Sequence, residues 1–301
     1  MTAPDVLTDE LVVPYADAGG GGEGRIVARV TRPAAGRVGA VLLLWPALGV
    51  SASYYAPLAD ELARRGVATV AADLRGQGAS RPRCGRGTRH GYQDFAAHDW
   101  PKLVRSVREL FPRGTPVHLL GHSIGGQVSL LYVARPEADV DGLVLVASGT
   151  VHHRSFPGAR RFGVLFGTQL AALVSRVLGY YPGHRLGFGG RQAGRVMRDW
   201  ARIGRTGRFE PTGADLDYEA AFAKVRLPVL AVSVAGDALA PPSAVDALCG
   251  RLAGCAVTRV HHTPASASHH GHTRWARDAE GVARHLIAWL NQLSAPPGAV
   301  R

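Results

Sequence analysis

The sequence has 301 residues, of which 46% are hydrophobic and 19% are charged, a composition that suits a globular protein with a full hydrophobic core. Its net charge of +12 is carried almost entirely by arginine, since Lys102 and Lys224 are the only lysines. Because the arginines are spread along the chain and not concentrated in one helix or tail, we predict a solvated basic surface and no nucleic-acid binding.

The sequence predicts neither a secretory signal nor a membrane span. Its first residues include acids and lack the apolar centre of a signal peptide, and no apolar run approaches the ~18 residues that cross a bilayer. Cys84, Cys249 and Cys255 lack C-x-x-C spacing and favour a reducing compartment over a disulfide framework. We therefore predict a cytoplasmic protein with no stable membrane insertion; its oligomeric state stays open.

The expected secondary structure begins with two β segments, at Glu10–Val13 and Ile26–Thr31, joined through a flexible turn at Gly19–Gly24. From there, short apolar runs alternate with segments of helical periodicity. The expected strands are Val41–Leu44, Val67–Ala71, Val117–Leu120, Leu143–Ala147, Val229–Val234 and Val257–Val260. The expected helices are Tyr54–Arg65, Phe95–Leu110, Ile124–Ala134, Pro242–Leu252 and Ala276–Gln292. This alternation predicts an α/β fold with a mostly parallel central sheet flanked by helices.

The alternation breaks between residues 148 and 226, where the chain is rich in arginine, glycine and aromatic residues. An insertion between two core strands, at the carboxyl edge of a parallel sheet, would lie over an active site. We therefore expect a core formed by residues 1–147 and 227–294, a helical cap insertion at 148–226 and a flexible tail at 295–301.

The segment at 117–126 predicts a buried strand that runs into a tight turn with Ser123 at its tip. Gly121-His122-Ser123-Ile124-Gly125 fits G-x-S-x-G, the nucleophile elbow. Such a reversal strains the backbone of the nucleophile and requires neighbours without bulk. The N–H of Ile124, at the start of a helix, would favour an oxyanion in the same space. On its own the pattern also fits a glycine-rich turn with an incidental serine.

A nucleophilic serine requires a histidine base and an acid that orients the base, and the elbow fold supplies them in the order serine, acid, histidine. Asp237 follows the expected strand Val229–Val234, in a turn before a helix that begins with prolines. The other late acids fall inside an expected helix or in the insertion. Asp237 is therefore the candidate acid, although aspartate is also common in turns.

Histidines cluster at and after the last expected strand, at His261, His262, His269, His270 and His272. The cluster contains neither H-E-x-x-H nor an aspartate, so we predict no metal site. Of the loop histidines we favour His269 as the base, because the two small residues before it would let the loop approach Ser123 closely. His270 and His272 remain the alternatives.

With these residues the chain resembles the α/β-hydrolase fold superfamily over nearly its whole length. Residues 73–80 resemble its D-x-R-G-x-G-x-S loop, VLLLWPALG at 41–49 occupies the place of the oxyanion strand and loop, and Asp237 with Pro241 resembles the acid turn. More narrowly, LWPALGVSASYYAPLADELARRG, GHSIGGQ and a late His-His-Gly resemble a group of bacterial hydrolases whose last motif reads roughly G-H-F-G-x-x-R. Laid on that motif, His269 takes the histidine position and Arg274 the arginine position.

The resemblance also implies the second oxyanion donor. Many relatives carry His-Gly before the donor residue, where this chain has Trp45-Pro46; proline has no N–H to donate. The resemblance therefore implies the N–H of Ala47, with that of Leu48 next in line.

Several residues are candidates for a substrate pocket: Leu48, His122, Tyr180, Tyr181 and Trp200. Aromatic residues of the insertion could instead pack the cap onto the sheet. The arginines between Arg154 and Arg208 could bind an anionic substrate, but a solvated face is the simpler expectation.

The sequence thus predicts a serine hydrolase that cleaves a carboxylic ester or a related acyl substrate. Ser123 would attack, His269 would carry the proton and Asp237 would orient His269, while Ile124 and Ala47 would hold the oxyanion; no metal or organic cofactor is required. Two alternatives remain: an acyltransferase that uses the same triad, and a non-catalytic ligand-binding protein of this fold.

Overall fold

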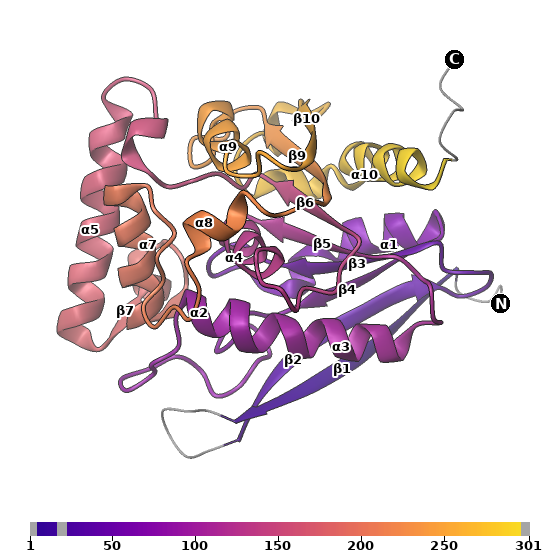
Figure 1. Ribbon diagram of the computed structural model, residues 1–301, viewed down its shortest axis with the longest axis horizontal. Coiled ribbons are helices and arrows are strands. Elements are labelled where there is room, and N and C mark those ends of the chain that lie inside the picture. Colours follow the sequence, from indigo (N-terminus) through magenta and orange to yellow (C-terminus); the bar gives the residue numbers. More distant parts are fainter. Residues whose placement is uncertain (1–4, 17–22, 296–301) are drawn as a thin grey trace.

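An eight-stranded sheet forms the centre of the molecule (Figure 1), with the strand order β1-β2-β4-β3-β5-β6-β9-β10. The strands are β1 Val6–Ala16, β2 Glu23–Pro33, β3 Ala40–Trp45, β4 Val67–Ala72, β5 Val117–His122, β6 Gly142–Val146, β9 Pro228–Val234 and β10 Ala256–His262. β1 pairs antiparallel with β2, and β2 antiparallel with β4; the remaining pairs are parallel. The computed structural model describes residues 5–16 and 23–295, and the sheet confirms the predicted α/β-hydrolase architecture.

The central strands are apolar without interruption because both of their faces are covered. In β3, Val41 and Leu43 join the core on one side of the sheet, while Leu42 and Leu44 join the core on the other side. Figure 1 shows α1 and α10 on one face of the sheet and α3 and α4 on the opposite face. The two cores hold the sheet rigidly, so that the loops at its carboxyl edge have fixed positions.

The helices outside the insertion are α1 Ala56–Arg64, α2 Tyr92–Asp94, α3 Trp100–Leu110, α4 Ile124–Val133, α9 Pro242–Cys249 and α10 Ala279–Ser294, with shorter turns η1 Ala52–Tyr55, η2 Phe95–Asp99, η4 Ala267–His269 and η5 Arg274–Arg277. They lie close to the predicted ranges. The helix expected at Phe95–Leu110 starts earlier, at Tyr92, and contains the π-helical turn η2. The expected turn Gly19–Gly24 and the tail fall largely on residues 17–22 and 296–301, outside the described residues.

The segment between β6 and β9, which we call the cap, has its own secondary structure. It contains η3 His153–Ser155, α5 Arg160–Leu178, β7 Tyr180–Pro182, α6 Gly183–Leu186, β8 Arg191–Ala193, α7 Gly194–Thr206 and α8 Tyr218–Phe222. Helices α5 and α7 stand side by side at the left end of Figure 1, away from both termini. They approach through small residues: a Cβ on Gly204 would lie 2.7 Å from Oγ1 of Thr168.

Candidate active site

Ser123 lies between β5 and α4 in a strained conformation. Its φ of 55° is in the left-handed region, which a residue with a side chain adopts only where the surroundings impose it. The adjacent glycines make this possible. A Cβ on Gly121 would lie 2.2 Å from Cα of Gly126, and a Cβ on Gly125 would lie 2.2 Å from the carbonyl oxygen of Trp45. The G-x-S-x-G spacing therefore reflects the close packing of helix, strand and neighbouring loop.

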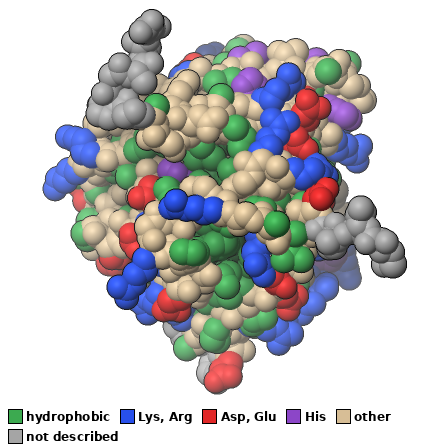
Figure 2. Space-filling view, turned by 90° about the vertical axis from the view of Figure 1, so that its right-hand side faces the viewer, with side chains coloured by type: hydrophobic (Ala, Val, Ile, Leu, Met, Phe, Trp, Pro, Cys, Tyr) green, Lys and Arg blue, Asp and Glu red, His purple; other side chains and the backbone are tan. Residues whose placement is uncertain are grey.

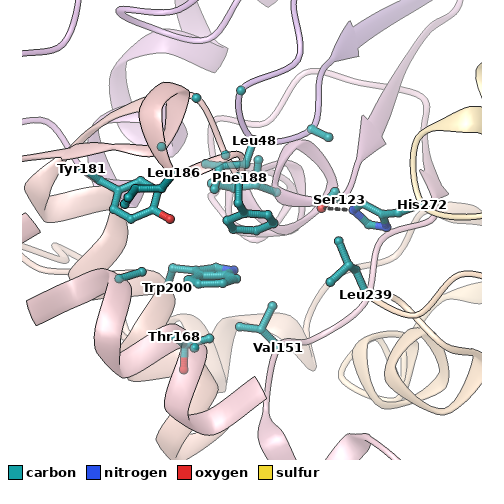
Figure 3. Close-up of a pocket in the computed structure, with 18 of the residues that line it drawn as sticks. Leu48, Ser123, Val151, Thr168, Tyr181, Leu186, Phe188, Trp200, Leu239 and His272 are labelled. Atoms are coloured by element: carbon teal, nitrogen blue, oxygen red, sulfur yellow. Dashed lines mark hydrogen bonds between the residues drawn. The ribbon is translucent and has the colours of Figure 1, made fainter. Parts of the chain in front are cut away.

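Three side chains meet above this turn in one hydrogen-bonded line. Oγ of Ser123 is 2.8 Å from Nε2 of His272, and Nδ1 of His272 is 2.9 Å from Oδ2 of Asp237. Figure 3 shows Ser123 and His272 pointing toward each other at the edge of a cavity. An Nδ1–H that donates to Asp237 leaves Nε2 free to accept the serine proton.

Asp237 is fixed by the turn that carries it. Its side chain is fully buried, and Oδ1 accepts hydrogen bonds from the N–H groups of Leu239 at 2.8 Å and Ala240 at 2.9 Å. Gly236, with φ of 70°, allows the sharp turn after β9. The carboxylate is thus oriented before any histidine approaches it, and the predicted position of the acid agrees with this geometry.

The structure corrects the choice of histidine, because His272 and not His269 contacts Ser123 and Asp237. His269 ends the short turn η4, and no contact joins its side chain to the other two residues. The side chain of His270 donates to the carbonyl of Pro264 at 3.3 Å. Neither of these two histidines reaches the serine.

A sequence signal for His272 exists in the glycine before it. Gly271 has φ of 105°, and its N–H donates to the carbonyl of Ala235 at 2.9 Å, which ties the histidine loop to the aspartate loop. The motif G-H-F-G-x-x-R can be laid on Gly271-His272 with Arg277 at its end as well as on His269 with Arg274. Only the first alignment puts a glycine of the motif directly before the histidine, where the positive φ of Gly271 lies.

The two N–H groups expected to hold an oxyanion differ in their availability. The N–H of Ile124 is the first of α4 and has no partner within the helix. The N–H of Ala47, by contrast, donates to the hydroxyl of Tyr55 at 3.1 Å. The N–H of Leu48 has no hydrogen-bond partner among the described residues, and Leu48 lines the same cavity as Ser123.

Tyr55 belongs to a buried chain of hydrogen bonds that the sequence did not reveal. Its hydroxyl is 2.6 Å from Nδ1 of His122, and Nε2 of His122 is 2.8 Å from the carbonyl oxygen of His272. Since a carbonyl only accepts, Nε2 carries the proton and Nδ1 accepts from Tyr55. Burial lowers the pKa of His122 well below its ordinary value, so this histidine stays neutral and connects the loop at Ala47 to the backbone of His272.

The cavity beside Ser123 is large and mainly apolar. It has a volume of about 1500 Å³, larger than most small-molecule sites. Of the predicted pocket residues, Leu48, Tyr181 and Trp200 line it and are visible in Figure 3. Residues that the sequence did not single out as pocket residues complete the wall, among them Val151, Phe156, Thr168, Leu186 and Leu239.

Two predicted pocket residues are not part of this wall. His122 is fully buried in its hydrogen bonds beneath the site. Tyr180 precedes Tyr181 on β7, and neighbouring residues of a strand point to opposite sides; its ring lies under the guanidinium of Arg191, 5.2 Å from the ring centre. Both residues therefore have structural positions and do not face the cavity.

Gln77, in the loop after β4, connects the core to the cap. Its Oε1 accepts from the N–H of Gly49 at 2.8 Å, and its Nε2 donates to Oε1 of Gln192 on β8 at 3.0 Å. In the same loop, Asp73 accepts from the N–H of Ala52 at 2.7 Å. The D-x-R-G-x-G-x-S segment thus supports the turn that contains Leu48.

In the described part of the chain, no group of three or more His, Cys, Asp or Glu side chains converges as metal ligands.

Comparison with known proteins identifies one matching family. A family model described as serine aminopeptidase, S33, matches residues 36–196, which is just over half of the chain. No curated protein matches the chain in sequence.

Solved structures share the fold at low sequence identity. An esterase from Thermogutta terrifontis has a TM-score of 0.65 at 17% identity, over 95% of this chain and 100% of that one. A soluble variant of monoglyceride lipase from Saccharomyces cerevisiae has a TM-score of 0.65 at 16% identity, over 93% and 96%. A monoacylglycerol lipase from Paleococcus ferrophilus has a TM-score of 0.56 at 16% identity, over 96% and 99%.

Proposed function

Because the chain belongs to the serine aminopeptidase S33 hydrolase family, we propose that it is a serine hydrolase that cleaves carboxylic esters through an acyl-enzyme intermediate. The observation that carries the proposal is the 2.8 Å contact of Ser123 Oγ with Nε2 of His272 at the wall of an apolar cavity. A serine at a strained turn, paired with a buried carboxylate through one imidazole, is arranged for nucleophilic attack.

In this mechanism Ser123 Oγ attacks the ester carbonyl carbon while its proton moves to Nε2 of His272. Asp237 accepts a hydrogen bond from the Nδ1–H of His272 and stabilises the imidazolium that forms. His272 then donates the proton to the leaving alcohol as the C–O bond breaks. In the second half, His272 takes a proton from water as the water oxygen attacks the acyl carbon. The bond between that carbon and Ser123 Oγ then breaks, and His272 returns the proton to Oγ as the carboxylic acid is released.

The negative oxygen of the tetrahedral intermediate needs two donors beside Ser123. We assign the N–H of Ile124, at the N-terminus of the ten-residue helix α4, where the helix dipole adds positive potential. The second donor is the N–H of Leu48, since that of Ala47 is bonded to Tyr55. Tyr55 and Gln77 hold the two ends of this loop, so the donor is in place before the substrate arrives.

The lining of the cavity favours an ester over the peptide substrate that the family description suggests. An aminopeptidase has to recognise a free α-ammonium group, and a carboxylate is the usual partner for such a cation. None of the described residues that line this cavity is an aspartate or a glutamate, whereas arginine and histidine are present. An apolar acyl chain fits this wall better than a charged peptide terminus. The esterase and lipases named above, which share the fold, support the same choice.

The direct test is turnover of a p-nitrophenyl ester by the Ser123→Ala variant. We expect a loss of at least about 10³-fold in kcat/KM with unchanged circular dichroism and thermal unfolding, since only the nucleophile is removed. Ser268→Ala, at an exposed serine of the histidine loop, is the matched control and should retain activity. Full activity in Ser123→Ala would overturn the mechanism. Product analysis with added alcohols separates hydrolysis from acyl transfer.

A further inference from the structure

The cap helix α5 exposes a stripe of large apolar side chains. Phe166, Leu173 and Val177 are 71%, 58% and 74% exposed, and Phe162 and Leu170 are also exposed. At 100° per residue these five positions fall within an arc of about 80° on one side of the helix. Monomeric proteins rarely expose such a contiguous apolar surface without a partner for it.

The opposite side of α5 has the reverse character. The residues that face the molecule and are buried are small or polar: Thr168, Ala171 and Ser175. Thr168 contacts α7 at Gly204, and Ser175 Oγ lies 3.5 Å from the carbonyl of Gly194. A helix that only covered a core would bury its large apolar residues and expose its polar ones. The side of α5 that carries the large apolar residues therefore faces away from the rest of the protein.

The sequence around this stripe is exclusively basic. Residues 142–198 contain eight arginines and neither aspartate nor glutamate. On α5 itself, Arg160, Arg161 and Arg176 are exposed, and none of them forms an ion pair with a described residue. The face at the other end of the molecule differs, since acidic and basic side chains alternate over it (Figure 2).

The stripe is continuous with the mouth of the cavity. Leu170, Leu186 and Phe188 are 60%, 56% and 38% exposed and also line the cavity. Figure 3 shows Leu186 beside Tyr181, and Phe188 between Leu48 and Trp200; the ring centres of Phe188 and Trp200 are 6.0 Å apart. An amphiphilic molecule that leaves an apolar surface at α5 would therefore reach Ser123 without crossing a polar barrier.

We propose that the cap docks on anionic phospholipid surfaces through α5, with the cavity mouth toward the lipid. Apolar side chains would enter the acyl boundary and arginines would pair with lipid phosphates. Among the described residues, α5 is the one helix long and apolar enough to cross a membrane, but its inner face packs on α7, so it lies along the interface and does not span it. The entry of acyl esters from the lipid rests on the proposed function, whereas the docking itself does not.

A second copy of the chain fits this surface less well. A symmetric pair formed through α5 would bring the arginines of both copies together, and residues 142–198 contain no aspartate or glutamate to neutralise them. An anionic lipid surface satisfies the apolar stripe and the positive charge at once. The apolar stripe and the positive charge therefore both favour an anionic lipid surface as the partner of α5.

The experiment is flotation of the full chain with vesicles of phosphatidylcholine, with and without phosphatidylglycerol. We expect binding that phosphatidylglycerol strengthens and salt weakens. The combined variant Phe166→Ser, Leu173→Ser, Val177→Ser should lower vesicle binding about tenfold or more. A matched control, Val12→Ser, Leu110→Ser, Leu293→Ser, changes three exposed apolar residues elsewhere and should bind as the parent does. Circular dichroism checks that both variants are folded.

The outcomes separate docking from catalysis. Hydrolysis of a short soluble ester should be unchanged in the α5 variant, because its three residues do not line the cavity. Parent protein that cleaves the soluble ester but stays with the unbound fraction overturns docking and leaves the hydrolase intact. Vesicle binding equal in parent and variant, or a dimer in sedimentation that the variant dissociates, also overturns it. Normal flotation without any ester cleavage removes the hydrolase and leaves docking standing.

Discussion

The groups that hold the loops around Ser123 are connected by a chain of hydrogen bonds. Tyr55 accepts from Ala47 and donates to His122, and His122 in turn holds the carbonyl of His272. Because Ala47, Tyr55 and His122 are buried, each hydrogen bond lost among them would leave an unpaired polar atom. The loop that carries the proposed oxyanion donor and the loop that carries the proposed base are thereby fixed relative to each other.

The assignment of the second oxyanion donor can be tested with Leu48→Pro, which removes one N–H. The N–H of Val50 donates to the carbonyl of Ala47 at 3.0 Å, and Gly49 has φ of 76°, as in a type II turn, which accepts proline at the position of Leu48. We expect kcat to fall about 10²–10³-fold. Leu48→Ala keeps the N–H and should change kcat far less. Equal kinetics for the two variants would return the role to Ala47.

Local motifs singled out the serine and the aspartate that His272 joins in the structure, but they did not single out this histidine. Ser123 and Asp237 are each determined by a strand end and a few adjacent residues. The histidine lies on a loop whose path depends on the Gly271 contact with Ala235, a tertiary interaction. Tyr55 and His122 were missed as supporting residues for the same reason, since their partners are distant in sequence.

Among the secondary-structure elements, the β5–α4 junction leaves no room for a side chain at Gly121. All three atoms nearest to a Cβ on Gly121 belong to the backbone of Gly125 and Gly126, so no side chain can move aside. In α5, by contrast, a Cβ on Gly163 would meet nothing within 4 Å. A methyl group therefore fits at Gly163 and does not fit at Gly121.

We expect Gly121→Ala to lower the free energy of unfolding by about 1–3 kcal/mol, as overpacking does, and to reduce esterase activity by displacing Ser123. Gly163→Ala, in an open helical position, should raise the free energy of unfolding by up to about 1 kcal/mol. Urea unfolding followed by circular dichroism measures both values. If Gly121→Ala proved as stable as the parent, the elbow would be looser than described.

The elements themselves were largely predictable, whereas the character of the cap was not. Continuous apolar runs such as Val41–Leu44 determine buried parallel strands. Within α5, apolar residues occur on more than one side of the helix, so periodicity alone does not tell which side faces the core. The contacts of Thr168 and Ser175 with α7 decide it.

Over the whole molecule, the buried histidines are neutral. Burial, reinforced by the positive charge of Arg75, lowers the pKa of His90 to about 3, and burial lowers the pKa of His118 to about 4. In the unfolded chain both titrate near the ordinary value of 6.5. Below that pH the unfolded chain therefore binds protons that the folded chain does not bind, and the protein loses stability as the pH falls.

We accordingly expect the contribution of the buried histidines to the free energy of unfolding to be constant above about pH 7 and to fall between about pH 6.5 and 4, with up to about 1.4 kcal/mol per pH unit for each of them. His118→Leu should remove the contribution of one histidine from this slope. The substitution costs no hydrogen bond at Nδ1, since that atom has no partner. Urea unfolding at several pH values measures the slope. A slope unchanged by the substitution would contradict the neutral burial of His118.

We propose that Ser123 is activated by His272 and not by His269. The most direct measurement of this activation is the rate of covalent labelling by a fluorophosphonate, with peptide mapping of the adduct. We expect a single adduct on Ser123, labelling of His269→Ala at the rate of the parent, and labelling of His272→Ala slowed by at least about 10³-fold. An adduct at another residue, or a slow His269→Ala beside a normal His272→Ala, would contradict this proposal.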